Sequence, residues 1–200
     1  MKIYLIRHSI TQGNKRRAYI GATDETLCEE GMELLKNRNY PQIEKLVASP
    51  MKRCIQTAKC IYPNKDVHTI DNLRECDFGA FEGMTYEQLK ENADYQEWIA
   101  KDGKIPFPKG EDQMEFRKRC IQGFDEAVAY FHENNVSCGA MVVHGGTIMA
   151  ILEAYARPEE DFYYWKVENG EGYEVDVDEE EWFKETELRE GHYVRVITSI

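Results

Sequence analysis

The sequence lacks the features that mark several protein classes. No apolar run approaches the ~20 residues of a membrane-spanning helix, and the apolar start reaches a charge at Arg7, too early for a signal-peptide core. Gly and Pro make up only 20 of 200 residues, which excludes collagen-like and low-complexity chains. The six cysteines include no C-x-x-C pair, so no zinc or redox motif appears. We therefore expect a cytoplasmic globular protein that binds no metal, no cofactor and no membrane.

Positive charge is also scarce. The formal net charge is −12, whereas a protein that binds nucleic acid needs a basic surface. The deficit is uneven, because residues 1–59 carry 11 Lys and Arg against 6 Asp and Glu, while the remainder carries 14 against 31. We expect no nucleic-acid partner, and we expect the N-terminal part of the chain to tolerate or attract anions.

Short apolar runs that lead directly into helical patterns indicate a parallel sheet covered by helices on both faces. Three such runs lie at Ile3–Ile6, Leu46–Ser49 and Met141–Val143, and residues 67–70 and 193–200 are predicted to be further strands. Helical patterns lie at about residues 29–38, 52–61, 86–101, 113–134 and 147–156. The sequence predicts an α/β fold, a single three-layer α/β/α domain over residues 1–200 with a mostly parallel central sheet.

Two segments interrupt this alternation. Residues 79–110 contain four glycines and the sequence Ile105-Pro106-Phe107-Pro108, which cannot be helical, and we expect them to form a small cap insertion. Residues 168–190 carry 11 carboxylates and are predicted to form a solvated hairpin and a surface helix. Neither segment indicates the oligomeric state, so the sequence is compatible with a monomer or a homodimer.

Charged and polar residues follow each of the three apolar runs. Arg7 and His8 follow the first run, Arg53 follows the second, and His144 follows the third, directly before Gly145-Gly146. In sheets of this kind, ligands bind beyond the carboxyl ends of the strands, beside helix N-termini. A single Arg or His at a strand end is usually a salt-bridge or turn residue. Two arginines and two histidines at one edge, however, suit a dianionic phosphate.

Four ordered motifs spread over residues 3–150. They are Arg7-His8-Ser9 with Thr11 and Asn14; Ser49-Pro50-x-x-Arg53-x-x-Gln56-Thr57-Ala58; Leu73-Arg74-Glu75-Cys76-Asp77-Phe78-Gly79 with Phe81-Glu82-Gly83; and Val143-His144-Gly145-Gly146. Gly110-Glu111 is a fifth, weaker match. With these motifs the chain resembles the histidine phosphatase superfamily, also called phosphoglycerate-mutase-like, over nearly its whole length.

The resemblance implies a metal-independent phosphatase that acts on a small-molecule phosphate monoester. His8 would be the nucleophile that forms a phosphohistidine, and its attacking nitrogen must then be unprotonated. Residues that would bind the phosphate are Arg7, Asn14, Arg53, His144 and Gly145.

The general acid implied by the resemblance is Glu75. It would protonate the departing alkoxide and then, as a carboxylate, activate the water that cleaves the phosphohistidine. Asp77 and Glu82 are the alternatives nearby.

Within the superfamily the sequence is most similar to the α-ribazole phosphatase group, which implies α-ribazole 5′-phosphate as substrate and a place in cobalamin biosynthesis. The cap aromatics Tyr86, Tyr95, Trp98 and Phe107 could stack on the base. A broad-specificity sugar-phosphate phosphatase, and after it a phosphoglycerate mutase, stay open as alternatives. A non-catalytic phosphate-binding relative is the least favoured, because its only support is Ser9, which stands where the family has Gly.

Overall fold

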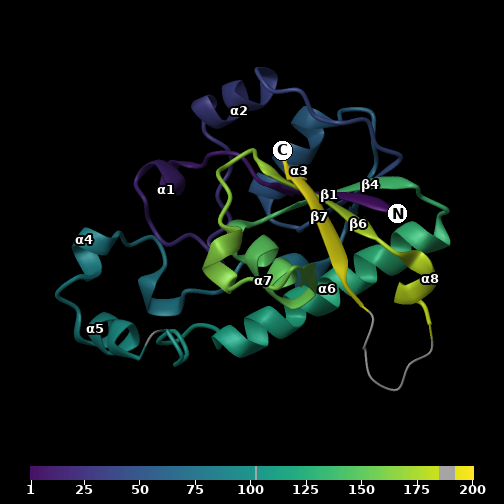
Figure 1. Ribbon diagram of the computed structural model, residues 1–200. Coiled ribbons are helices and arrows are strands. Elements are labelled where there is room, and N and C mark those ends of the chain that lie inside the picture. The colour runs from purple at the N-terminus through teal and green to yellow at the C-terminus, as the bar shows by residue number, and fades with distance from the viewer. Residues whose placement is uncertain (102, 185–191) are drawn as a thin grey trace.

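A seven-stranded sheet forms the centre of the computed structural model, which describes residues 1–101, 103–184 and 192–200. The strand order is β3-β2-β4-β1-β6-β7-β5 (Figure 1). The strands are β1 (Lys2–Arg7), β2 (Lys45–Ala48), β3 (Val67–Thr69), β4 (Cys138–Val143), β5 (Ala156–Arg157), β6 (Gly172–Val177) and β7 (Val194–Ser199). The first four run parallel, and β6 is antiparallel to both β1 and β7. The predicted mostly parallel sheet is confirmed.

The position of β1 inside the sheet explains why apolar and polar residues do not alternate in its sequence. Successive side chains of a strand point to opposite faces of the sheet. Ile3 and Leu5 belong to one buried hydrophobic cluster, and Tyr4 and Ile6 belong to a second. Both faces of the strand are therefore covered, as expected for a strand in the parallel part of a sheet.

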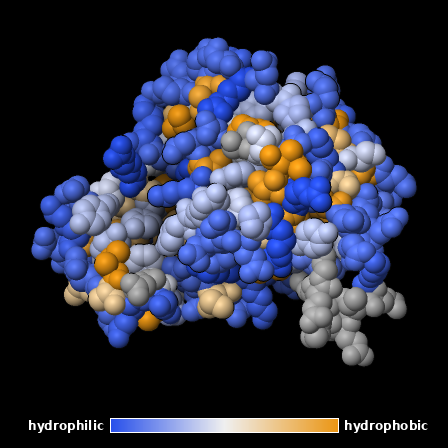
Figure 2. Space-filling model, in the orientation of Figure 1, coloured by the Kyte–Doolittle hydropathy of each residue, from blue (hydrophilic) through white to orange (hydrophobic). Residues whose placement is uncertain are grey.

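Helices lie on both faces, which confirms the three-layer architecture. Phe124 of α6 (Gln113–Glu133) and Ile148 of α7 (Gly145–Tyr155) pack in the cluster of Ile3. Cys54 of α3 (Lys52–Ile61) packs in the cluster of Ile6, and α2 (Glu29–Lys36) contacts α3. Among the described residues, no helix combines the length and the apolar character needed to cross a membrane. Hydrophilic residues predominate on the face shown in Figure 2.

The predicted cap insertion is a lobe beside the sheet, visible at the left of Figure 1. It contains η2 (Gly79–Phe81), α4 (Tyr86–Leu89) and α5 (Ala93–Ala100). A third hydrophobic cluster joins Tyr95, Trp98 and Phe107 of the lobe to Phe116 of α6. The lobe thus has its own small core, which is anchored on the long helix of the main body.

The prediction of one helix over residues 86–101 is wrong. The helix is interrupted after α4, and Asn92 begins a new one by accepting a hydrogen bond from the Tyr95 backbone N–H at 3.0 Å. An Asn side chain satisfies the free N–H groups of a helix start, so it competes with continuation of the preceding helix.

The acidic segment also differs from its prediction. Its first part is β6, an inner strand between β1 and β7, and Val175 and Val177 of this strand are buried. Only α8 (Glu179–Trp182) resembles the predicted surface helix, and Trp182 of this helix is buried as well. Residues 185–190 of the segment lie outside the described residues. The remaining short elements are α1 (Gln12–Lys15), η1 (Asp71–Leu73) and η3 (Phe162–Trp165).

Candidate active site

The two histidines and Arg53 meet at the carboxyl ends of three neighbouring parallel strands. His8 follows β1, His144 follows the adjacent β4, and Arg53 lies in the first turn of α3 after β2. The rings of His8 and His144 meet edge to face, with 5.2 Å between their centroids. All three side chains are at least nine-tenths buried. Residues 136 positions apart in the sequence thus form one site, as the strand-end argument predicts.

His8 is held as a neutral imidazole. Its Nδ1 lies 2.7 Å from the backbone oxygen of Ser9, a carbonyl that can only accept, so Nδ1 carries the proton. Burial, followed by the nearby positive charges of Arg53 and Arg7, lowers the pKa of His8 well below its usual value. Nε2 therefore keeps its lone pair, which is the state that a nitrogen nucleophile requires.

Arg53 is a fully buried cation at the centre of the site. Its Nε donates to Nδ1 of His144 at 3.2 Å, and its two terminal nitrogens donate to the backbone oxygens of Thr23 and Gly21, both at 2.9 Å. Among the described residues, no carboxylate lies within ion-pair distance of Arg53. A buried guanidinium that donates only to neutral acceptors leaves positive charge available for an anion.

His144 is also neutral in this arrangement. Because its Nδ1 accepts from Arg53, its Nε2 carries the proton and donates to Oγ of Ser49 at 2.8 Å. Burial and the charge of Arg53 lower the pKa of His144 well below its usual value. The imidazole thus adds no second charge to the site, and its single N–H is bound to Ser49.

Arg7 supplies the second cation. One terminal nitrogen donates to the backbone oxygen of Val167 at 2.7 Å, while its buried Nε has no hydrogen-bond partner among the described residues. A Cβ at Gly145 would stand 3.3 Å from this Nε, so the start of α7 passes close to the guanidinium. An unpartnered buried N–H beside a helix N-terminus points to an anionic ligand.

Glu75 lies on the other side of the same helix start. Its Oε2 accepts from the Gly146 backbone N–H at 3.1 Å, and its Oε1 accepts from the N–H of Cys76 at 3.0 Å. Burial of the carboxyl group outweighs these hydrogen bonds and raises the pKa of Glu75. A Cβ at Gly146 would stand 2.4 Å from Oε1. The two tandem glycines therefore let one helix start approach Arg7 and Glu75 together.

The two alternative acids are occupied elsewhere. Asp77 accepts from the N–H of Gly79 at 2.8 Å and so closes a turn. Glu82 accepts from Oγ1 of Thr23 at 2.6 Å and from backbone N–H groups of the segment 21–23 and of Phe78. These contacts hold a turn and a loop segment, whereas Glu75 binds the helix start beside Arg7, so Glu75 stays the candidate acid.

Glu82 instead supports the segment that binds Arg53, a role that the sequence did not indicate. The segment 21–23, which its carboxylate binds, provides the two carbonyl oxygens that accept from Arg53. A Cβ at Gly21 would stand 1.7 Å from the backbone oxygen of Cys76, so this segment also packs tightly against the acid loop. Any one Glu among 37 acidic residues gives no sequence signal for such a role.

Asn14 lies in a network below His8. Its Oδ1 accepts from the N–H of Thr11 at 3.1 Å, which completes the capping box of α1, and from Nδ2 of Asn169 at 3.3 Å. Asn169 also donates to the backbone oxygen of His8 at 2.9 Å. The structure thus links Asn14 to the backbone of His8 through Asn169, a residue that site prediction from the sequence missed.

Ser9, the departure from the family motif, faces away from the phosphate side. Its Oγ donates to the backbone oxygen of Gly31 in α2 at 2.7 Å, and its N–H donates to Oγ1 of Thr57 at 2.9 Å. The hydroxyl therefore ties β1 to α2. This geometry removes the support that Ser9 gave to a non-catalytic relative.

Two cavities share Glu75. One, of about 280 Å³, has an aromatic lining that includes Tyr19, Phe78, Trp98, Phe107 and Phe116. The other, of about 370 Å³, is polar and is lined by Arg74, Asp77, Glu111 and Arg119. The candidate acid thus stands between an apolar space and a polar one.

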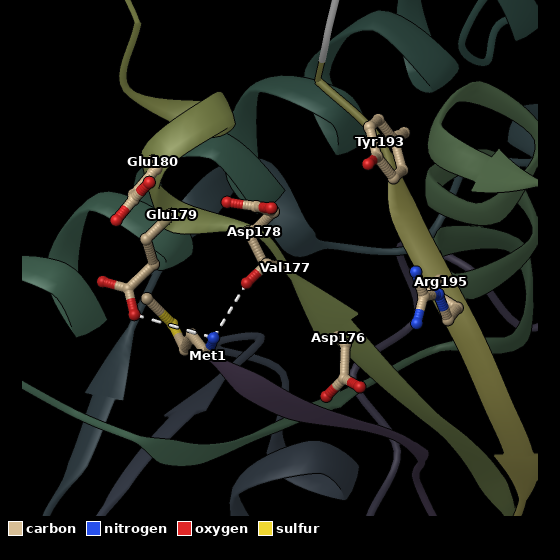
Figure 3. A pocket seen from close by; sticks show the side chains of 8 residues that line it. All are labelled: Met1, Asp176, Val177, Asp178, Glu179, Glu180, Tyr193 and Arg195. Atoms are coloured by element: carbon tan, nitrogen blue, oxygen red, sulfur yellow. Dashed lines mark hydrogen bonds and ion pairs between the residues drawn. The ribbon is translucent and has the colours of Figure 1, made fainter.

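A third cavity, of about 480 Å³, lies at the opposite end of β1 (Figure 3). Asp176, Asp178, Glu179 and Glu180 line it, and the N-terminal amine of Met1 lies among them, 3.6 Å from Glu179. Its mostly acidic walls do not suit a phosphate. In the described part of the chain, no group of three or more His, Cys, Asp or Glu side chains could hold a metal ion.

The chain belongs to the histidine phosphatase superfamily (branch 1), whose sequence profile matches residues 3–187. Phosphoserine phosphatase 1 of Hydrogenobacter thermophilus is 30% identical over 67% of each chain. The adenosylcobalamin/alpha-ribazole phosphatase of Salmonella typhimurium is 24% identical over 88% of this chain and 91% of its own. The crystal structure of the alpha-ribazole phosphatase from Shigella flexneri superposes with a TM-score of 0.76 at 24% identity, over 90% and 92% of the two chains, and so shares the fold. The chain is therefore a phosphatase.

Proposed function

We propose that this phosphatase hydrolyses small phosphate monoesters through a phosphohistidine at His8 and needs no metal ion. The observation that carries the proposal is the neutral His8 beside the buried Arg53 and the partly buried Arg7, neither of which pairs with a carboxylate among the described residues. Positive charge fixed before the reaction stabilises the charge that develops on the transferred phosphoryl group.

In the first step, Nε2 of His8 forms a bond to phosphorus while the bond from phosphorus to the ester oxygen breaks. Glu75 in its carboxylic acid form, which burial favours, gives its proton to that oxygen, and the alcohol leaves. Arg7 and Arg53 hold the phosphoryl oxygens, and His144 joins them when its Nε2–H exchanges Ser49 for a phosphoryl oxygen. Two of the five N–H donors of Arg53 are not used by the contacts described above and can serve this purpose.

In the second step, the carboxylate of Glu75 takes a proton from water as the water oxygen bonds to phosphorus. The N–P bond breaks, inorganic phosphate leaves, and His8 and Glu75 return to their starting states. Turnover of p-nitrophenyl phosphate should survive excess EDTA and should be inhibited by vanadate. Activity that disappears on chelation and returns with a divalent metal would contradict the proposal.

The substrate that we propose is α-ribazole 5′-phosphate, whose base suits the aromatic cavity beside Glu75. Of the four aromatics expected at the base, Trp98 and Phe107 line this cavity. Tyr95 is buried in the core of the lobe, and Tyr86 is more than half exposed. Binding energy gathered on the base, away from the phosphate, can position the reacting bond.

Stacking on a base contributes about 1–3 kcal/mol, so kcat/KM for α-ribazole 5′-phosphate should exceed that for ribose 5-phosphate by about ten- to a hundredfold. The control is Tyr86→Ala, which removes an exposed lobe aromatic outside the cavity and should leave this ratio unchanged, whereas Phe107→Ala should reduce it. Equal kcat/KM for the two substrates would indicate a broad phosphatase. Conversion of 3-phosphoglycerate to its 2-isomer with a bisphosphoglycerate primer would indicate a mutase.

A phosphatase of broader specificity is the second candidate. It is favoured by the polar cavity, where the exposed Arg74 could pair with a carboxylate on a substrate. A relative named for phosphoserine is consistent with such a substrate. In a panel of phosphorylated metabolites, this candidate predicts phosphoserine turnover at least equal to that of α-ribazole 5′-phosphate, with a loss in Arg74→Ala confined to carboxylate-bearing substrates.

A further inference from the structure

Arg119, near the middle of α6, uses its whole guanidinium group on two neighbours. Nε and NH2 donate to the two carboxylate oxygens of Glu111 at 2.6 and 2.7 Å. This bidentate pair is mostly buried, with side chains 18% and 19% exposed. A pair with such geometry and burial is held more firmly than a surface ion pair.

The remaining donors bind the backbone of the loop that carries Glu75. NH1 donates to the carbonyl oxygens of Asn72 and Arg74 at 3.0 and 2.6 Å, and NH2 donates to that of Glu75 itself at 2.9 Å. These five contacts use all five N–H donors of the group. Arg119 therefore holds three backbone carbonyl groups of the segment 72–75, including that of the candidate acid Glu75 itself.

Glu111 holds the same loop at Asp77, two residues after Glu75. Its N–H donates to the backbone oxygen of Asp77 at 2.9 Å, and its carboxylate accepts from the N–H of Asp77 at 3.3 Å. The loop over residues 72–77 is thus held on both sides of Glu75 by one Arg–carboxylate pair. The pair also connects the loop to α6, the helix that supports the cap lobe.

We propose that Arg119, paired with Glu111, is the positioning residue that sets the general acid Glu75 for proton transfer to the leaving group. This inference rests on the role proposed for Glu75. Arg119 acts on the acid through the loop backbone, whereas the carboxylate of Glu75 binds the N–H groups of Cys76 and Gly146. A displaced loop would move the carboxyl group while leaving Arg53 and His8 in place, because Arg53 lies in α3 and His8 directly follows β1, both outside the loop.

The leaving group separates positioning of the acid from general damage to the structure. An alkyl phosphate needs its alkoxide protonated as it leaves, whereas the phenolate of p-nitrophenyl phosphate leaves unaided. Loss of the acid position therefore slows phosphorylation by the alkyl ester selectively. Damage to the fold or to the phosphate-binding residues slows both substrates alike.

The test measures single-turnover phosphorylation rates for both substrates in Arg119→Lys and Glu111→Gln. Lys keeps the charge but cannot supply five donors in a fixed plane. We expect the rate with the alkyl ester to fall about ten- to a hundredfold more than that with p-nitrophenyl phosphate in Arg119→Lys, and in the same direction but less in Glu111→Gln. If Arg119→Lys does not fold, Glu111→Gln carries the test alone.

Two controls define the comparison. Arg117 lies two residues earlier on α6, and its NH1 donates to both carboxylate oxygens of Glu153 at 2.7 and 2.9 Å. This pair does not touch the loop, so Arg117→Lys should leave the ratio of the two rates unchanged. Glu82→Gln weakens the support of Arg53 and should slow both substrates equally.

Glu75→Gln, measured in parallel, separates the two proposals. A selective loss in Glu75→Gln without one in Arg119→Lys and Glu111→Gln would overturn only the role of Arg119. No selective loss in Glu75→Gln would overturn the acid role of Glu75, and with it the inference on Arg119.

Discussion

The phosphate-binding half of the site and its acid half are held in different ways. His8, Arg53 and His144 are buried at the ends of neighbouring strands and α3, so the sheet itself sets their positions. Glu75 is partly buried in a loop outside the sheet, and polar contacts from α6 and α7 hold it. The residues proposed to bind the phosphoryl group, which all phosphate monoesters share, are thus part of the core. The residue proposed to protonate the leaving group, which differs between substrates, lies in a loop packed against that core.

Loss of Arg53 tests the phosphate-binding half and should have the largest effect. Arg53→Ala removes a fixed charge at the phosphoryl oxygens and should lower kcat/KM about 10²–10³-fold, by the same factor for an alkyl phosphate and for p-nitrophenyl phosphate. Arg38→Ala, which breaks an ion pair with Glu171 near the surface, is the control and should have little effect. A loss confined to one substrate would place Arg53 in the acid half.

Loss of the acid should separate the two halves. Glu75→Gln keeps the shape of the side chain but cannot give a proton, so we expect about a 10²-fold loss for an alkyl phosphate and less than about tenfold for p-nitrophenyl phosphate. Equal losses in pre-steady-state phosphorylation would move the acid role to another residue.

The pH profile of the same variant gives a second test of the acid. Burial raises the pKa of Glu75, and only its protonated form can act in the first step, so kcat/KM for an alkyl ester should fall as the pH rises through that pKa. Burial lowers the pKa of His8, so the nucleophile should stay neutral to below the usual titration range of histidine. Glu75→Gln should abolish the alkaline fall and leave the acidic limb in place.

Substitutions of the adjacent residues Gly145 and Gly146 compare the two halves with the same chemical change, and their expected effects are smaller. A Cβ at Gly146 would collide with the carboxylate of Glu75 at 2.4 Å, whereas one at Gly145 would stand 3.3 Å from Nε of Arg7. Gly146→Ala should therefore slow hydrolysis of an alkyl phosphate about tenfold more than Gly145→Ala does, with little difference for p-nitrophenyl phosphate. Steady-state kinetics of the two variants would measure this, and the reverse order would contradict the assignment of the halves.

Ser9 should give the smallest effect. Ser9→Gly removes the hydrogen bond to Gly31 and should cost about 1 kcal/mol of stability, a fall in Tm of about 2–4 °C, with kcat changed less than about twofold. Ser9→Ala, which keeps the Cβ, is the matched control for backbone freedom. A tenfold change in kcat in both variants would mean that the hydroxyl reaches the phosphate.

The two halves also differ in how far they could be predicted. Strand ends are recognisable from the sequence, and parallel strands bring their carboxyl ends to one edge, so His8, Arg53 and His144 could be placed together from their spacing alone. The resemblance to the family then indicated their roles and that of Glu75. The support of Glu75 by Arg119 crosses 44 residues and consists of contacts to backbone carbonyls, which leave no pattern in side-chain types.

Two predictions about the fold failed for physical reasons, one in the acidic segment and one in the cap lobe. In β6, charged residues alternate with apolar ones, in the order Tyr173-Glu174-Val175-Asp176-Val177. This alternation is typical of a strand with one buried face, but the high charge of the whole segment favoured the interpretation as a solvated surface. The sequence predicts that the cap aromatics can stack on a base, but Tyr95 instead packs against Phe81 and Trp98 in the lobe core.

The central claim is that His8 carries the phosphoryl group during hydrolysis. The most direct measurement is a rapid acid quench of the protein turning over ³²P-labelled p-nitrophenyl phosphate in the presence of EDTA, followed by separation of labelled protein. We expect a phosphoprotein that forms before steady state, is labile to acid and stable to base, and is absent in His8→Ala. Undiminished turnover by His8→Ala, or turnover by the unmodified protein with no labelled intermediate, would contradict it.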